Sequence, residues 1–139
     1  SGELFLRIDH SAISVADTQR SLAFYARLGL SVGARSLNVG PTQERLDAVP
    51  NAEVEVTALD LPTGAKPHAE LLCYRGAFDR NVALPRLDDI AATRLVFAIE
   101  SGDALQALCQ SFSDRLIRRD GPSVLLRDPD GHIVEIEIC

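Results

Sequence analysis

Residues Phe5 to Gly29 read FLRIDHSAISVADTQRSLAFYARLG, a strand pattern followed directly by a helix pattern. Rough alternation of polar and apolar residues over Phe5–Val15 predicts a strand. Asp17 is a suitable N-cap for the helix that follows, and Gly29 is a suitable stop after it. Between these two residues the apolar side chains recur at helical spacing. The chain therefore opens with a strand–helix unit.

Three further strands are expected after this helix, because alternating segments are separated by Gly- and Pro-rich breaks. They cover Leu30–Leu37, Glu53–Leu61 and His68–Tyr74. The loop between the first two of them holds one helical turn at Gln43–Ala48. A segment without a clear pattern follows at 76–91, and we interpret it as a linker.

The same order of elements then begins again. Thr93–Ile99 predicts a strand, Gly102–Phe112 predicts an amphipathic helix, and three short strands follow at Arg115–Arg119, Ser123–Arg127 and Ile133–Ile138. Strand–helix–strand–strand–strand thus occurs twice, over about 5–75 and about 92–139. We expect an α+β fold in which two βαβββ modules form a single domain over residues 3–139.

Composition narrows the classes of function. The chain has 139 residues and a net charge of −6 at pH 7, which disfavours nucleic acids and anionic membrane surfaces as partners. Five Phe and two Tyr leave little for base stacking. The three cysteines include no CxxC pair, which favours a reducing compartment, and we expect a cytoplasmic protein with Cys73 and Cys109 in its core.

The first and last strands of each half place four polar residues at matching positions. Because side chains alternate across a strand, His10 and Arg94 both lie on the face opposite the helix. Glu70 and Glu135 match each other on the closing strands. If the two sheets curve towards each other, these four groups converge. Imidazole and carboxylate groups bind zinc, nickel, iron or manganese, so His10, Glu70 and Glu135 are a candidate ligand set.

Four segments carry a resemblance to a known family: IDHSAISVAD (Ile8–Asp17), SLAFYARLGL (Ser21–Leu30), AELLCY (Ala69–Tyr74) and DPDGHIVEI (Asp128–Ile136). With them the chain resembles the vicinal oxygen chelate superfamily of glyoxalases, bleomycin-resistance proteins and ring-cleaving (extradiol) dioxygenases. The resemblance covers nearly the whole chain and is specific for the superfamily, not for a reaction. It implies paired half-barrels around one concave pocket, metal ligands on the first and last strands of each module, and a homodimer.

Arg94 departs from the pattern of that family. Members with a full metal site usually have His at this position, whereas arginine stays protonated and cannot bind a cation. The resemblance therefore leaves His10, Glu70 and Glu135 as metal ligands. Arg94 either pairs with one of the glutamates in place of the metal, or holds an anionic group of the substrate.

Three functions stay open. The first is a metal-assisted lyase or isomerase of glyoxalase type, acting on a small molecule with adjacent oxygens. Its divalent cation would stabilise an oxyanion while Glu135 or Glu70 moves a proton. The second is a metal-free binding or resistance protein for a drug or metabolite, in which Arg94 neutralises the glutamates. A ring-cleaving dioxygenase is the third, and the missing second histidine counts against it.

Further residues are candidates for supporting roles. His68 precedes Glu70 by two positions, roughly 6–7 Å along the strand, so we expect it at the rim of the pocket with metal binding as the alternative. Tyr74 is either a proton donor in contact with substrate or a core residue. Residues 43–45 form either a substrate-selecting lid, in which Arg45 contacts the substrate, or a solvent-exposed turn.

Overall fold

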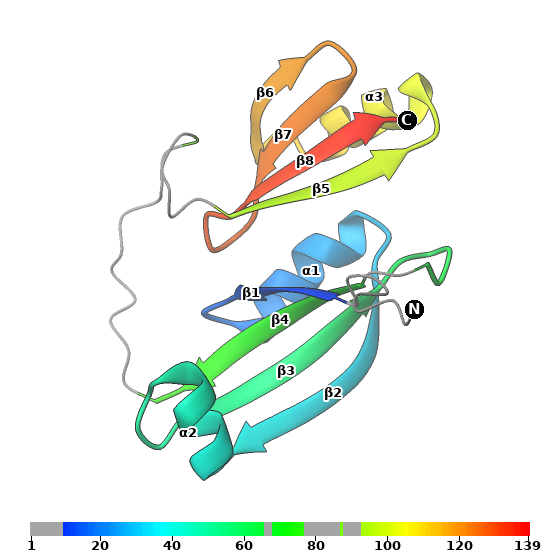
Figure 1. The fold of residues 1–139 in the computed structure, drawn as a ribbon. Coiled ribbons are helices and arrows are strands. Elements are labelled where there is room, and N and C mark those ends of the chain that lie inside the picture. Colours follow the sequence, from blue (N-terminus) through cyan, green and yellow to red (C-terminus); the bar gives the residue numbers. More distant parts are fainter. Residues whose placement is uncertain (1–9, 66–67, 77–86, 88–92) are drawn as a thin grey trace, which may run out of the picture. The chain divides into compact units, whose positions relative to one another are not determined.

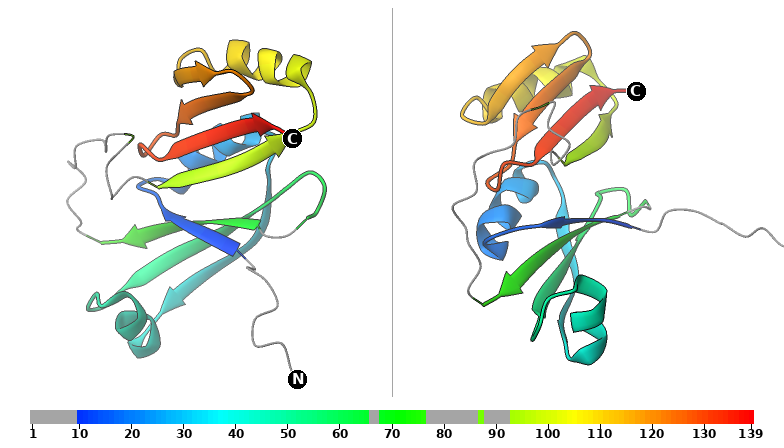
Figure 2. Two further views of the ribbon diagram at one scale, coloured as in Figure 1. Left: turned by 45° about the horizontal axis from the view of Figure 1, so that its top comes forward. Right: turned by 60° about the vertical axis from the view of Figure 1, so that its left-hand side comes forward.

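The computed structural model describes residues 10–65, 68–76, 87 and 93–139. They fall into two compact units, Ser1–Arg80 and Asn81–Cys139, called module one and module two below. Each module has a βαβββ order and its own four-stranded mixed sheet (Figures 1 and 2), which confirms the expected fold class. The beginning of the first expected strand, at residues 5–9, and most of the linker at 76–91 lie outside the described residues.

Module one contains β1 (His10–Ser14), α1 (Thr18–Arg27), β2 (Ser31–Val39), α2 (Pro41–Asp47), β3 (Glu53–Asp60) and β4 (His68–Arg75). The strand order in its sheet is β1-β4-β3-β2. β1 runs parallel to β4, and the other neighbours are antiparallel. The repeat of strand and helix therefore produces a sheet in which the first and last strands of the module are neighbours.

Helix α1 begins and ends where the sequence indicates. The Asp17 carboxylate accepts a hydrogen bond of 2.8 Å from the backbone N–H of Arg20, which satisfies one free donor of the first turn. Gly29 follows the helix with a φ of 89°, a left-handed conformation that glycine adopts without strain. The helix buries Phe24 and Tyr25 in the core of the module.

Two elements of module one are longer than the sequence indicates. β2 extends to Val39 because its pairing with β3 continues as far as Glu53. A bulge follows Val32 at Gly33, where a Cβ atom would lie 2.6 Å from a carboxylate oxygen of Asp60, so that a larger residue would require the Asp60 side chain to move. The expected single turn is a seven-residue helix, α2, which starts with proline at a position where no N–H is needed.

Module two contains β5 (Arg94–Ile99), α3 (Gly102–Ser111), β6 (Leu116–Asp120), β7 (Ser123–Arg127) and β8 (Ile133–Ile138), in the sheet order β5-β8-β7-β6. The buried Asp128 carboxylate accepts hydrogen bonds from the backbone N–H groups of Asp130 and His132, which holds the tight turn between β7 and β8. The order of strands in the sheet is the same in the two modules, and in each the first and last strands pair in parallel while the other neighbours are antiparallel.

The expected burial of two cysteines can be compared with this structure. Cys73 and Cys109 are half-buried, so the prediction that they lie in the core is wrong. Cys73 stands between the half-buried Leu72 and Tyr74, and Cys109 is followed by the exposed Gln110. None of the helices in the described residues has the length and apolar character needed to span a bilayer.

Candidate metal centre

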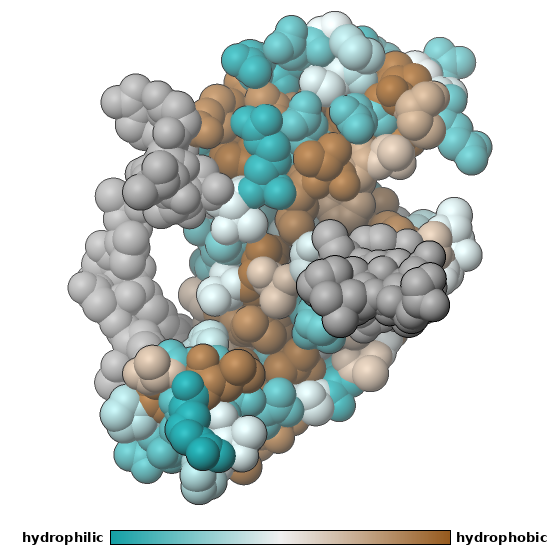
Figure 3. All heavy atoms as spheres, viewed as in Figure 1, coloured by the Kyte–Doolittle hydropathy of each residue, from teal (hydrophilic) through white to brown (hydrophobic). Residues whose placement is uncertain are grey.

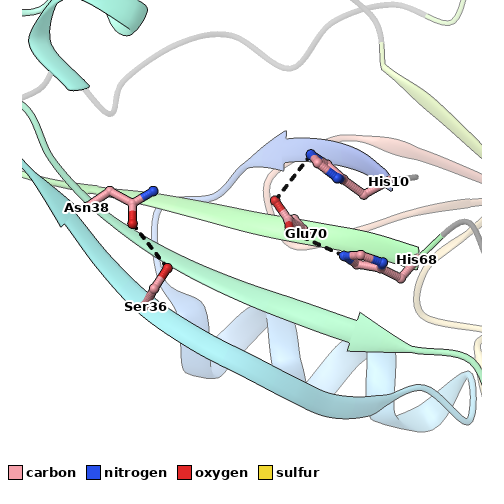
Figure 4. Close-up of polar contacts among 5 residues, drawn as sticks. All are labelled: His10, Ser36, Asn38, His68 and Glu70. Carbon is pink, nitrogen blue, oxygen red and sulfur yellow. Dashed lines mark hydrogen bonds and ion pairs between the residues drawn. The ribbon is translucent and has the colours of Figure 1, made fainter. Parts of the chain in front are cut away.

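Two histidines of module one lie side by side on neighbouring strands. In the parallel β1–β4 pair, His10 is opposite His68 and Ala12 is opposite Glu70. Since side chains alternate along each strand, these polar residues share the face of the sheet turned away from α1 (Figure 4). We call this the site face, and on its first two strands it comprises His10, Ala12 and Ser14 of β1 with His68, Glu70, Leu72 and Tyr74 of β4.

The Glu70 carboxylate lies between the two imidazoles (Figure 4). One oxygen is 3.3 Å from Nε2 of His68, and the other is 3.6 Å from Nε2 of His10. The ring centroids of His10 and His68 are 5.5 Å apart. One donor atom from each of the three residues lies within 4.8 Å of the other two. The strands thus gather two nitrogen donors and one carboxylate at a single point of module one.

Burial and charge favour a cation at this point. The His68 side chain is 10% exposed and that of Glu70 21%, whereas His10 is 45% exposed and leaves the group open on one side. In the part of the chain that the structure describes, Glu70 forms no ion pair with arginine. With both imidazoles neutral, the group carries one negative charge in a partly desolvated position, and such a charge is stabilised by a cation.

The site face continues across the sheet with a different chemistry. Val56 of β3 lies opposite Leu72 of β4, and both are half-buried. Figure 3 shows apolar surface on the sheet of module one beside polar surface. On β2, the Ser36 hydroxyl donates a 3.2 Å hydrogen bond to the side-chain oxygen of Asn38, at the far side of this face (Figure 4). A ligand bound at Glu70 would therefore meet an apolar strip before it meets polar groups again.

The two substrate-contact candidates of module one are placed differently. Tyr74 lies on the site face, half-buried, four residues beyond Glu70. Burial, reinforced by the negative charge of Asp47 and a hydrogen bond to it, raises the pKa of the Tyr74 phenol above its ordinary value. Arg45 lies on α2 and is exposed, as in the solvent-exposed alternative. Its contact with a substrate stays a prediction.

The two remaining candidates lie in module two. Nη1 of Arg94 is 3.3 Å from a carboxylate oxygen of Glu135, so Arg94 does pair with one of the two candidate glutamates. The Arg94 side chain is 47% exposed and that of Glu135 is 19% exposed. The convergence of this pair with His10 and Glu70 stays a prediction.

His68 lies closer to Glu70 than its spacing along the strand indicates. Its spacing from Glu70 along the strand suggested a position at the rim, but the structure places its imidazole nitrogen Nε2 beside the Glu70 carboxylate. In the sequence, the proximity of these two side chains is indicated by the pattern His-x-Glu, which places both residues on one face of one strand. What the sequence alone did not indicate is that His10 lies directly opposite His68.

The family of the chain follows from its sequence pattern. A model of the Glyoxalase/Bleomycin resistance protein/Dioxygenase superfamily matches residues 7–136. The chain belongs to this superfamily. The match spans both modules and confirms the resemblance noted in the sequence. A comparison with curated protein sequences finds no match.

Solved structures of the superfamily share this fold. A glyoxalase-family protein from Bacillus cereus is 17% identical, with a TM-score of 0.74, and the match covers 98% of this chain and 95% of that one. Glyoxalase I from Leishmania major is 22% identical, with a TM-score of 0.65 and coverages of 96% and 87%. The fosfomycin resistance protein FosX from Listeria monocytogenes is 14% identical, with a TM-score of 0.62 and coverages of 98% and 93%. Likeness at these identities establishes the fold and not the reaction.

Proposed function

We propose that this superfamily member is a metal-assisted small-molecule enzyme, a lyase or isomerase that acts on a substrate with adjacent oxygens. The observation that carries the proposal is the gathering of His10, His68 and Glu70 on the site face. Three donors from two neighbouring strands leave further positions around a cation for substrate oxygens.

The donor set fits a divalent transition metal. Zinc, nickel, iron and manganese accept neutral imidazole nitrogen together with carboxylate oxygen. Donors bound to one such cation lie roughly 3–3.5 Å apart, since each bond is about 2.0–2.2 Å long. The contacts of 3.3 and 3.6 Å between Glu70 and the two imidazoles are close to that spacing. Small side-chain rotations would therefore complete the group.

The cation, when bound, would polarise a substrate oxygen and stabilise negative charge on it. Arg94 would hold an anionic group of the substrate, because its guanidinium suits carboxylate or phosphate. Glu135 and Glu70 are the carboxylates offered to accept a proton. Tyr74 would keep its proton at neutral pH, since its pKa is raised, and would act as a hydrogen-bond donor.

One structural neighbour supports this choice of substrate class. A variant of Listeria FosX has been solved with Mn(II) and a dihydroxypropylphosphonic acid, and its fold matches this chain with a TM-score of 0.59 at 14% identity. That ligand combines adjacent hydroxyl groups with an anion. A substrate of the same general kind would offer adjacent oxygens to a cation held by the His10–His68–Glu70 group.

Metal content tests the proposal directly. The purified protein is incubated separately with zinc, nickel, manganese and ferrous ions, desalted, and analysed for retained metal. We expect near-stoichiometric retention of at least one ion and a loss of retention in Glu70→Gln. The contrary result is a protein that retains none of the four. Retention of ferrous iron alone would direct assays to oxygen uptake with catechols, because two histidines and a carboxylate also serve non-haem iron oxygenases.

The Arg94–Glu135 ion pair favours a second candidate, a metal-free protein that binds a drug or metabolite. In that case the guanidinium takes the position of the cation, and the pocket only holds a ligand. Arg94→His separates the two candidates. Metal retention that appears only in this variant would support the binding protein, whereas unchanged retention by the unmodified protein would support the enzyme.

A further inference from the structure

We infer that module one holds the cation alone, through His10, His68 and Glu70, and that Glu135 of module two is not a ligand. This inference rests on the proposed function and names the residues that the metal contacts. It differs from the ligand set that the resemblance implies, in which Glu135 takes part and His68 does not.

At equivalent positions of the internal repeat, module two lacks donors that module one has. In the parallel pair of module one, His10 is opposite His68 and Ala12 is opposite Glu70. In the parallel pair of module two, Arg94 is opposite Ile133 and Val96 is opposite Glu135. The positions of the two histidines are thus occupied by arginine and isoleucine. An isoleucine offers no donor atom and an arginine only donates protons, so one donor of three remains.

The remaining donor of module two already has a cationic partner. The Glu135 carboxylate lies 3.3 Å from the Arg94 guanidinium and is mostly buried. A divalent cation on Glu135 would stand close to this guanidinium, and the two positive charges would repel each other. Glu70 has no such competitor among the described residues, since both of its oxygens face imidazoles. The two carboxylates therefore have different neighbours, although their positions in the repeat are equivalent. Glu135 faces a permanent positive charge, whereas Glu70 faces two imidazoles.

His68 restores the number of ligands that Arg94 removes. The resemblance predicts a histidine at the Arg94 position, and the chain has its second histidine on β4 of module one instead. Two imidazoles from directly paired strands and a carboxylate two positions further along make a site that needs no donor from module two. Arg94 and Glu135 then remain paired with each other.

Metal titrations of matched variants test this assignment. Manganese and zinc are titrated into the unmodified protein, His68→Gln, Glu135→Gln and His132→Gln, with calorimetry and manganese paramagnetic resonance as readouts. We expect His68→Gln to weaken binding about 100-fold or more, since a direct ligand is lost. Glu135→Gln and the module-two control His132→Gln should change the affinity by no more than about threefold, since they remove no ligand.

A second measurement avoids dependence on how the variants fold. In the unmodified protein, zinc should shift the imidazole nitrogen resonances of His10 and His68 and leave those of His132 in place. If Glu135→Gln weakens binding as much as His68→Gln, or the His68 resonances do not move, the inference is wrong while the proposed function stands. If the unmodified protein binds neither manganese nor zinc and also retains neither nickel nor ferrous iron, the proposed function and the inference both fail.

Discussion

The Thr57 hydroxyl is fully buried and has no hydrogen-bond partner among the described residues. A buried hydroxyl without a partner costs stability, because it has lost its contacts with water and gained none in return. We therefore expect Thr57→Val, which keeps the shape of the side chain, to raise the free energy of unfolding by about 1 kcal/mol. Urea denaturation followed by circular dichroism measures the change.

Thr18→Val is the matched control for that substitution. Thr18 is also buried, but its hydroxyl makes a hydrogen bond with Glu55 that, together with Arg75, holds the pKa of that carboxyl below its ordinary value. The same chemical change should therefore lower stability here. Equal effects of the two substitutions would show that the Thr57 hydroxyl is not an unsatisfied group.

The case of His68 shows how far residue-level reasoning reaches from sequence alone. Period-two alternation correctly placed His10, His68 and Glu70 on one face. The separation of 6–7 Å along the strand describes backbone positions, however, and long side chains close that distance at their tips. The pairing of His10 with His68 depends on strand register, which is set by the packing of the whole sheet and not by either strand alone.

At the scale of elements, most helices and strands could be predicted because local signals agreed with the hydrophobic pattern. Asp17 and Ser101 cap α1 and α3, and each accepts a backbone N–H of the first turn. The ends of β2 were predicted less well, since strand length depends on how long the partner strand β3 continues. Local sequence carries no information about that partner.

A hydrogen bond of Tyr74 links β4 to helix α2. The Tyr74 phenol makes a hydrogen bond with Asp47, and Asp47 also accepts a 2.6 Å hydrogen bond from the side-chain amide of Gln43. Ionising the phenol beside the Asp47 carboxylate would place two negative charges together in a partly buried position. The link between α2 and β4 therefore depends on a protonated Tyr74.

An alkaline titration tests this link. The pKa of Tyr74 is raised in the folded protein, so its contribution to stability is complete below about pH 10 and is lost as the pH rises through the raised value. The difference in tyrosinate absorbance between the unmodified protein and Tyr74→Phe isolates this residue. We expect it to ionise above pH 10, and Asp47→Asn to shift its ionisation downward. Ionisation at the ordinary pH in both proteins would contradict the interaction with Asp47.

At the scale of the whole molecule, the internal repeat places different residue chemistry at equivalent positions of the two modules. Both modules keep the same strand order and the same pairing register, so their backbones hold equivalent positions. Substitution at those positions then changes the chemistry without changing the fold. Module one carries donors for a cation, and module two carries a guanidinium suited to an anion.

Size leads us to expect that the two modules unfold together as a single domain. Module two spans Asn81–Cys139, and a unit of roughly 60 residues buries too small a fraction of its surface to be more than marginally stable alone. Leu71 of module one and Leu126 of module two are both completely buried. If stability is shared, Leu71→Ala and Leu126→Ala should each lower one common unfolding transition by about 2–5 kcal/mol.

Calorimetry distinguishes shared from separate stability. In the cooperative case, each variant shows one heat-absorption peak whose calorimetric and van't Hoff enthalpies agree. Modules that unfold independently would instead give two transitions, with Leu71→Ala displacing one and Leu126→Ala the other. That outcome would also bear on function, since a cation on module one would then raise the melting temperature of one transition only. With a single domain, added metal should raise the melting temperature of the whole chain.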